Sequence, residues 1–218
     1  MLKNTEIPSA GPWGDELERT RYELDLNSES VVFDVGGYVG EWADKISKKY
    51  KCKVFCYEPV KEFYNKIKEL KNNNIIVEEK ALGTFSGKEK MMLSGDGSSI
   101  EKYGKRKNPS HKGFDEKYKC SASEEINVID VNEVIFEFEM IDVMKINTEG
   151  SEYELLNNLI ESGSIEKIKY LQVQFHSFVD GANEMYEDIK DKMNKTHELV
   201  LDSRWKWTYW KLKNGDVS

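Results

Sequence analysis

The segment of residues 31–40 constrains the fold more than any other part of the sequence. It reads VVFDVGGYVG, a short apolar run that ends in glycines, and residues 39–50 follow with Trp42, Ile46 and Tyr50 spaced by four. A short apolar run is typical of a buried parallel strand, and a spacing of four is typical of a helix. A buried strand, a glycine turn and a helix together favour an α/β fold, in which helices cover both faces of a sheet.

The rest of the chain continues this alternation of strands and helices. Apolar patterns predict strands at residues 53–57, 75–82, 88–93, 126–129, 141–146 and 169–175. They predict helices at residues 131–139, 151–161 and 183–194, and one that starts near Pro59 and carries Phe63, Ile67 and Leu70. A hairpin is expected from residues 198–201 and 205–212. Because no repeat or linker interrupts the 218 residues, we expect one domain with an N-terminal extension at residues 1–28.

Composition excludes several classes of protein. The net charge of −8 argues against a general nucleic-acid binder, which needs a surplus of Lys and Arg. Hydrophobic residues make up 39% of the chain, but no apolar run approaches the ~18 residues of a membrane span, and the start lacks the apolar core of a signal peptide. The three cysteines (Cys52, Cys56 and Cys120) have no CxxC spacing, which favours a cytoplasmic location.

Residues 94–123 depart from the regular pattern. This segment is rich in Gly, Ser and Lys, and its six lysines and one arginine against four acids give it a charge of +3, which leaves −11 on the rest. A long irregular stretch inside a domain is usually a functional loop or a flexible one. We expect a basic loop insertion that acts as a substrate lid, in which Arg106 and His111 attract an anionic acceptor. The alternative is a flexible, solvated loop.

The order of residues in the glycine turn indicates a class of cofactor. A dinucleotide fingerprint requires Gly-x-Gly-x-x-Gly, whereas here the order is Asp-x-Gly-Gly-x-x-Gly. S-adenosylmethionine (SAM) has no phosphate, and an acidic residue suits its ammonium and sulfonium groups. Glu58 follows the last glycine by 18 residues, at a strand end where an acid can hold ribose hydroxyls. The alternative is an ordinary tight turn and a surface glutamate. The expected cofactor-binding residues are Asp34, Gly36, Gly37, Tyr38, Gly40 and Glu58.

Three blocks of the sequence resemble a known enzyme family. They are FDVGGYVGEW at residues 33–42, YEPV at 57–60 and MKINTEGSEYELL at 144–156. In this combination the chain resembles the FkbM family of class I SAM-dependent methyltransferases. The resemblance implies a Rossmann-like, seven-stranded and mostly parallel sheet with one antiparallel strand near the C-terminus. It also implies SAM as cofactor, S-adenosylhomocysteine (SAH) as product, and O-methylation of hydroxyls on saccharides or metabolites.

Two positions depart from the family's pattern. Asn147 stands where the family usually has Asp, and Tyr38 stands where Asn is frequent. An amide is a poor base and a weak metal ligand. We therefore expect no metal site, although a divalent ion stays open.

Polar residues follow several of the predicted strands, where ligands of an open α/β sheet bind. We expect Asp34, Glu58, Asn147, Glu149 and His176 to converge there. Methyl transfer requires an aligned acceptor oxygen that loses its proton. His176 is the expected general base, because the ordinary pKa of histidine is about 6.5. Glu149 is expected to act as a base or to orient the acceptor. The alternatives are a packed histidine and a glutamate that caps a helix.

Lys145 is expected to meet a carboxylate, because burying an unpaired charge is costly. That pair is either structural or part of the catalytic set, which as predicted contains Glu149, His176, Asn147 and Lys145. On the last predicted strand Trp205, Trp207 and Tyr209 share one face, opposite Trp210. Such aromatic rings either stack on a sugar or pack against the protein.

Two other functions stay open at this point. An NAD(P)-dependent Rossmann oxidoreductase shares the first three elements, and a SAM-binding module that has lost catalysis would be consistent with Asn147. The expected partner is a small-molecule or saccharide acceptor. The oligomeric state is left open.

Overall fold

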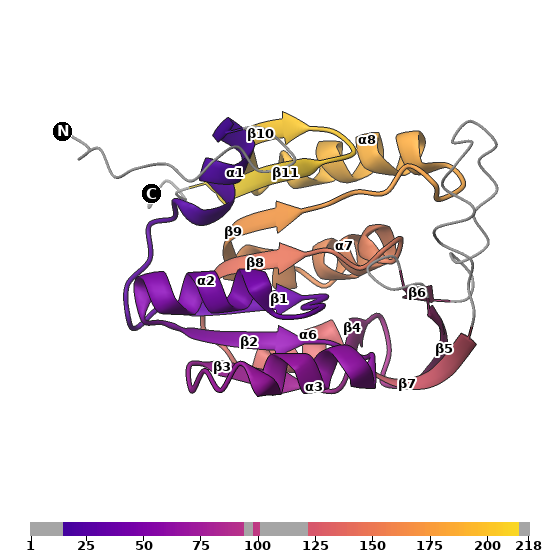
Figure 1. Ribbon diagram of the computed structural model, residues 1–218. Helices are drawn as coiled ribbons and strands as arrows, with labels where there is room; N and C mark the ends of the chain where they lie inside the picture. Colours follow the sequence, from indigo (N-terminus) through magenta and orange to yellow (C-terminus); the bar gives the residue numbers. More distant parts are fainter. Residues whose placement is uncertain (1–14, 94–97, 101–121, 214–218) are drawn as a thin grey trace.

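A seven-stranded sheet forms the centre of the protein. The computed structural model describes residues 15–93, 98–100 and 122–213. The strand order is β3-β2-β1-β8-β9-β11-β10, and the strands from β3 to β9 run parallel (Figure 1). β11 is antiparallel to both of its neighbours, which confirms one reversed strand near the C-terminus. The strands are β1 (Val31–Val35), β2 (Lys53–Tyr57), β3 (Ile75–Glu78), β8 (Ile141–Ile146), β9 (Ile168–Val173), β10 (His197–Ser203) and β11 (Trp207–Leu212).

Helices cover both faces of this sheet, as Figure 1 shows. On one face lie α1 (Asp15–Tyr22), α2 (Glu41–Tyr50) and α3 (Lys61–Glu69). On the other lie α6 (Val131–Phe136), α7 (Glu152–Glu161) and α8 (Ala182–Met193), with the short 3-10 turn η1 (Ser164–Lys167) after α7. Pro59 precedes α3 instead of starting it, because Val60 is still extended at the N-cap.

The central strands are buried on both faces. Phe33 of β1 packs into the core beneath α6, α7 and α8, whereas its neighbour Val32 packs with Trp42 and Ile46 of α2. Successive strand residues point to opposite faces, so a strand covered on both sides needs apolar residues at nearly every position. This explains why the apolar runs at residues 31–35, 53–57 and 141–146 give the strand bounds directly.

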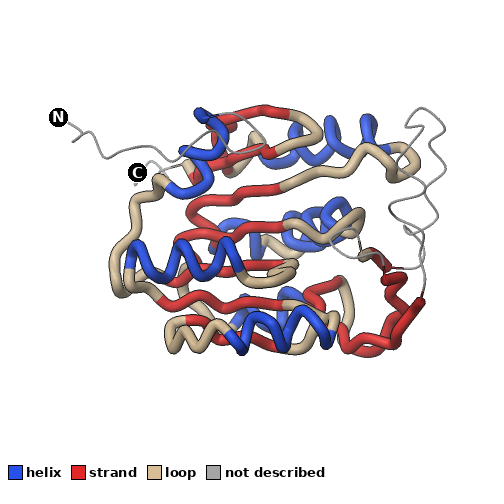
Figure 2. Tube along the Cα trace, viewed as in Figure 1, coloured by secondary structure: helices blue, strands red, loops and turns tan. Residues whose placement is uncertain are grey.

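A second, four-stranded sheet was not expected from the sequence. Its order is β4-β7-β5-β6, formed by β4 (Ala81–Gly83), β5 (Gly87–Leu93), β6 (Ser99–Ile100) and β7 (Ala122–Asp130). The strand predicted at residues 75–82 is therefore divided between two sheets. Figure 2 shows the second sheet beside the carboxyl ends of the parallel strands. Here β5 and β7 pair antiparallel over seven positions. The strands predicted at residues 88–93 and 126–129 are parts of these two, but their pairing in a separate sheet was not predicted.

The segment predicted as a basic loop, residues 94–123, lies largely outside the described residues, and so do Arg106, His111 and Cys120. The described parts belong to the second sheet, as β6 and the start of β7. The predicted N-terminal extension contains α1, whose Leu17 packs on the last strand.

The C-terminal aromatic residues pack within the protein. Trp207 and Tyr209 form a buried cluster with Leu17, and Trp210 lies in the main core on the opposite face. Trp205 lies in the turn between β10 and β11, with its ring centroid 6.0 Å from that of Tyr186. The packing alternative is therefore confirmed for the three buried rings. In the described part of the chain, no helix combines the length and apolar character that crossing a membrane requires.

Gly36 provides a test of how the turn after β1 depends on close packing. It has φ +80°, and a Cβ placed on it would lie 1.9 Å from the carbonyl oxygen of Asn147. Gly163 has nearly the same φ, +77°, but no atom within 4 Å of such a Cβ. We expect Gly163→Ala to lower the free energy of unfolding by about 1 kcal/mol through backbone strain alone. Gly36→Ala should lower the free energy of unfolding by clearly more than Gly163→Ala does, or prevent folding.

The measurement is urea unfolding followed by tryptophan fluorescence on both variants and the wild type. Equal losses in the two variants would show that the contact with Asn147 can relax, contrary to this expectation.

Candidate active site

The glycine turn, residues 36–40, hydrogen-bonds mainly to the protein itself. The N–H groups of Gly36 and Gly37 both donate to the carbonyl of Tyr57, at 3.0 and 3.3 Å. A Cβ on Gly37 would lie 2.3 Å from Cys56 Sγ, and one on Gly40 would lie 2.9 Å from Leu70. The glycines therefore let the turn approach β2, β8 and the end of α3. Of these three glycines, only Gly36 lines the cleft described below.

Asp34 and Lys145 form a buried ion pair beneath this turn. Lys145 Nζ lies 2.8 Å from Asp34 Oδ1 and also donates to the carbonyl of Gly36 at 2.8 Å. Asp34 is fully buried and Lys145 is 5% exposed. Burial raises the pKa of Asp34, although Lys145 opposes part of that rise. The pairing expected for Lys145 is thus confirmed. Neither side chain lines the cleft, so a direct contact between the Asp34 carboxylate and a cofactor is not supported.

Glu58 stands at the end of β2, as the sequence predicts, but is buried (5% exposed). Its Oε2 accepts from the N–H of Tyr38 at 2.8 Å, and its Oε1 accepts from the N–H of Val60 at 2.9 Å. Burial raises the pKa of Glu58 from 4.5 to about 7, because these bonds and the more distant Lys145 only partly offset desolvation. Glu58 is therefore a carboxyl group that changes charge near neutrality.

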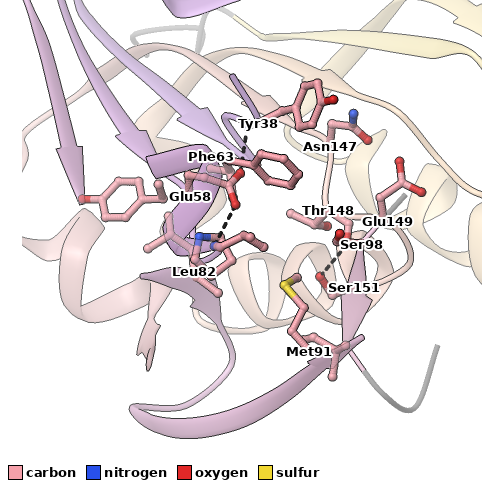
Figure 3. A pocket seen from close by; sticks show the side chains of 17 residues that line it. Tyr38, Glu58, Phe63, Leu82, Met91, Ser98, Asn147, Thr148, Glu149 and Ser151 are labelled. Atoms are coloured by element: carbon pink, nitrogen blue, oxygen red, sulfur yellow. Dashed lines mark hydrogen bonds between the residues drawn. The ribbon is translucent and has the colours of Figure 1, made fainter. Parts of the chain in front are cut away.

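A cleft of about 600 Å³, which includes space open to solvent, lies at the carboxyl edge of the sheet (Figure 3). Glu58 lies on one wall, and Asn147 and Glu149 lie on the wall across from it. Asn147 Oδ1 is buried with no hydrogen-bond partner among the described residues. The remaining lining is mostly apolar or hydroxyl-bearing, and comes partly from the second sheet: Val35, Gly36, Tyr38, Tyr57, Pro59, Val60, Phe63, Ala81, Leu82, Met91, Ser98, Ile100, Thr148 and Ser151.

His176 lies between two carboxylates. Its Nε2 is 3.1 Å from Glu149 Oε1, and its Nδ1 is 3.1 Å from Glu152 Oε1. Burial by itself lowers the pKa of His176, but the two carboxylates outweigh it, Glu152 most, and raise the pKa to about 10. His176 is therefore protonated at neutral pH. An imidazolium has no lone pair to accept a proton, so this environment favours another group than His176 as the general base.

The structure brings together six of the twelve predicted residues and adds one that sequence reasoning missed. Gly36, Tyr38, Glu58, Asn147 and Glu149 line one cleft, and His176 contacts it through Glu149. Glu152, which is fully buried, was missed because an acidic residue in the first turn of a helix usually faces solvent. The only sequence signal is its spacing of three from Glu149, which places both residues near the start of α7.

Comparison with known proteins identifies the family. The methyltransferase FkbM domain matches residues 34–200 of the chain. The chain belongs to the FkbM methyltransferase family. No curated protein matches the sequence at a significant level.

Solved structures similar to this FkbM-family domain share its fold. The FkbM methyltransferase from Methylobacillus flagellatus KT has a TM-score of 0.56 and 15% identity over 86% of this chain and 44% of its own. The domain thus spans less than half of that protein. The Streptococcus mutans protein SMU.1697c, solved with SAH, has a TM-score of 0.51 and 12% identity over 97% of this chain and 100% of its own. At such identities the likeness establishes the fold alone.

The described residues of this FkbM-family domain can be compared with the ligand clusters that metal ions require. Within these ranges no group of three or more His, Cys, Asp or Glu side chains is arranged to hold an ion. Asn147, where the family usually has Asp, has an amide oxygen in the cleft wall.

The Lys145–Asp34 pair yields a stability test. Lys145→Met removes the cation and leaves Asp34 buried without its partner, which typically costs about 3–5 kcal/mol. We expect that loss in urea unfolding at neutral pH, and a partial recovery in the double variant Asp34→Asn/Lys145→Met. The control is Lys45→Met, because Lys45 pairs with Glu41 on the exposed side of α2 and should change stability by less than about 1 kcal/mol. If Lys145→Met is no more harmful than Lys45→Met, the pair does not hold the site together.

Proposed function

We propose that this FkbM-family domain is a SAM-dependent O-methyltransferase that acts on a hydroxyl of a saccharide, a nucleotide-linked sugar or a glycosylated metabolite. The observation that carries the proposal is the pair of carboxylates, Glu58 and Glu149, on two walls of one cleft at the carboxyl edge of the sheet. One carboxylate suits a ribose and the other suits an acceptor hydroxyl. The family match supports methyl transfer over the oxidoreductase alternative.

The residues of the cleft fit SAM. Glu58 retains acceptor capacity beyond its two backbone bonds and can receive the ribose hydroxyls. The unpartnered Asn147 Oδ1 can accept from the ligand's ammonium group. Tyr38 and Phe63, whose ring centroids are 4.6 Å apart, supply an aromatic wall. The solved SMU.1697c structure contains SAH in the same fold, which supports the same ligand here. When bound, SAM supplies a methyl group on a positively charged sulfur.

The chain's own residues then position the acceptor and remove its proton. We propose that the Glu149 carboxylate receives the proton of the attacking hydroxyl, because Glu149 lines the cleft. His176, as an imidazolium 3.1 Å from Glu149 Oε1, orients that carboxylate and keeps it near the wall. Asp34 and Lys145 act indirectly, by holding the glycine turn. This assignment moves the base from His176 to Glu149.

The charge of the cleft bears on the acceptor. Of the lining side chains that the structure describes, only Glu58 and Glu149 carry charge. Such walls suit a neutral, hydroxyl-rich acceptor. An anionic acceptor would need the cations of residues 101–121, with Arg106 and His111 as the proposed contacts, and these lie outside the described residues.

Binding of SAH should release a proton near neutral pH. The pKa of free Glu58 is about 7, and ribose hydroxyls favour its ionised form, so affinity should rise as pH increases toward and past 7. Below pH 7 we expect up to a tenfold loss of affinity per pH unit, measured by titration calorimetry between pH 5.5 and 8.5. Glu58→Gln should weaken SAH binding by about 10- to 100-fold and remove this pH dependence.

Glu62→Gln is the control. Because Glu62 is exposed on α3, this variant should bind SAH as the wild type does. NAD titrated in parallel should not bind. An unchanged affinity in Glu58→Gln would remove Glu58 from the cofactor site, and tight NAD binding would favour the oxidoreductase.

Turnover tests the role of Glu149. With wild-type protein, labelled SAM and a panel of sugars, nucleotide sugars and glycosides, we expect transfer to at least one hydroxyl. Glu149→Gln should lower kcat about 100- to 10,000-fold, the usual contribution of a general base, with SAH affinity unchanged within twofold. Glu154→Gln, on the exposed side of α7, is the matched control and should keep full turnover.

Full turnover in Glu149→Gln would exclude Glu149 as the base. Tight SAH binding by the wild type without transfer to any acceptor of the panel would favour a SAM-binding module that has lost catalysis.

A further inference from the structure

The side chain of Glu152 joins two segments that are distant in sequence. Its Oε2 accepts from the N–H of Gly150 at 2.8 Å and from Thr148 Oγ1 at 3.3 Å. Its Oε1 accepts from the backbone N–H of His176 at 2.9 Å and faces His176 Nδ1 at 3.1 Å. One carboxylate therefore ties the turn after β8, residues 147–151, to the segment after β9.

We propose that Glu152 is a positioning residue for methyl transfer, which through His176 and the turn after β8 holds the Glu149 carboxylate in the cleft wall. Its effect on turnover rests on the proposed function, but its effect on His176 does not. Glu152 itself is fully buried and does not line the cleft, so it acts only through its neighbours.

The backbone of Glu149 indicates why the turn needs to be held. Glu149 has φ 52°, in the left-handed region that residues other than glycine rarely adopt, and Gly150 follows with φ 115°. Such strain persists only where surrounding contacts determine the conformation. Here the Glu152 carboxylate accepts from the backbone N–H of Gly150, the residue after Glu149, and His176 contacts the Glu149 side chain at Oε1. Both contacts depend on Glu152.

The geometry also favours a doubly protonated His176. Each ring nitrogen faces a carboxylate oxygen at 3.1 Å, and a neutral imidazole can donate from only one of its two nitrogens. With both protons present, both contacts are hydrogen bonds between opposite charges. Removing the charge of Glu152 leaves His176 with Glu149 alone, so its proton should be held less tightly.

Few groups face His176 among the residues that the structure describes. Besides Glu149 and Glu152, the phenol of Tyr153 donates to its backbone carbonyl at 2.9 Å, and the ring of Phe178 lies 5.3 Å from the imidazole. The charges of the two carboxylates and their hydrogen bonds to the ring are what raise the pKa of His176. Because the folded-state pKa of about 10 lies above the ordinary 6.5, the imidazolium stabilises the fold fully below pH 6.5 and loses that effect as the pH rises through 10.

The first experiment needs no substrate. The imidazole ¹⁵N signals of the full chain are followed by NMR from pH 6 to 10.5, with His176→Gln to assign them. In the wild type we expect both nitrogens of His176 to remain protonated at pH 8.5. In Glu152→Gln we expect the titration midpoint of His176 to fall by at least one pH unit. Wild-type His176 that titrates near 6.5 would overturn the proposal, and this test stands even if Glu152→Gln fails to fold.

The second experiment measures turnover against pH, with the acceptor found in the panel. In Glu152→Gln we expect kcat to fall 10- to 100-fold, SAH affinity to stay within twofold, and a new decline in kcat on the alkaline side at the lowered midpoint of His176. Glu152→Asp, which keeps the charge, should restore the shape of the wild-type pH profile. Glu154→Gln should match the wild type throughout.

A purely structural role would reduce turnover and stability without moving the pH profile, and that result would overturn the proposal. Failure of the proposed function has a different signature. In that case the wild type shows no transfer or no SAH binding, while the NMR titration of His176 still gives its own answer.

Discussion

The buried ion pair between Lys145 and Asp34 is the interaction on which the carboxyl edge depends. A single ammonium group contacts the Asp34 carboxylate and the Gly36 carbonyl, both at 2.8 Å, and so joins β1, β8 and the glycine turn. Neither charge could stay buried without the other. Because the same turn presents the N–H of Tyr38 to Glu58, the position of Glu58 in the cleft wall follows from an ion pair that does not itself line the cleft.

The pair belongs to a polar row that crosses the sheet. Cys56, Asp34, Lys145, Gln172 and Tyr209 are register partners on five neighbouring strands, from β2 to β11. Register partners point to the same face of a sheet. At this level the sheet therefore carries polar side chains between its apolar layers. Lys145 pairs with Asp34, and Gln172 donates to the carbonyl of Arg21 in α1. This explains how the N-terminal helix is joined to the strand level that supports the site.

The sequence predicts the parallel sheet well because burial on both faces leaves an apolar run that has few other interpretations. The bounds of β1, β2 and β8 follow directly, and so does the place of Glu58 at a strand end. The strands at residues 88–93 and 126–129 are predicted too, but the second sheet is not, because the pairing of β5 with β7 joins residues that are far apart in the chain.

Two features of the site that the sequence does not reveal, the environment of His176 and the burial of Glu152, have an electrostatic cause. The ordinary pKa of a histidine suggests a base, but that value applies to a solvated ring. In the fold, Glu152 and Glu149 raise the pKa of His176 to about 10. The burial of Glu152 depends on donors from two separate segments, Gly150 and His176, and such a meeting cannot be inferred from spacing along one helix.

The carboxylates of the cleft lie in opposite electrostatic environments, and this difference separates their roles. Glu58 is buried with backbone N–H groups, and no cation of the described residues contacts it, so its pKa rises to about 7. Its charge therefore responds to a bound ligand. Glu149 and Glu152 both contact the ring of His176, at 3.1 Å each, and these contacts limit the movement of the two carboxylates. Carboxyl groups whose environments differ in this way are the usual means by which one site divides binding from proton transfer. On this basis Glu58 is suited to recognise hydroxyl donors of a cofactor, whereas Glu149, held by His176, is suited to face the acceptor.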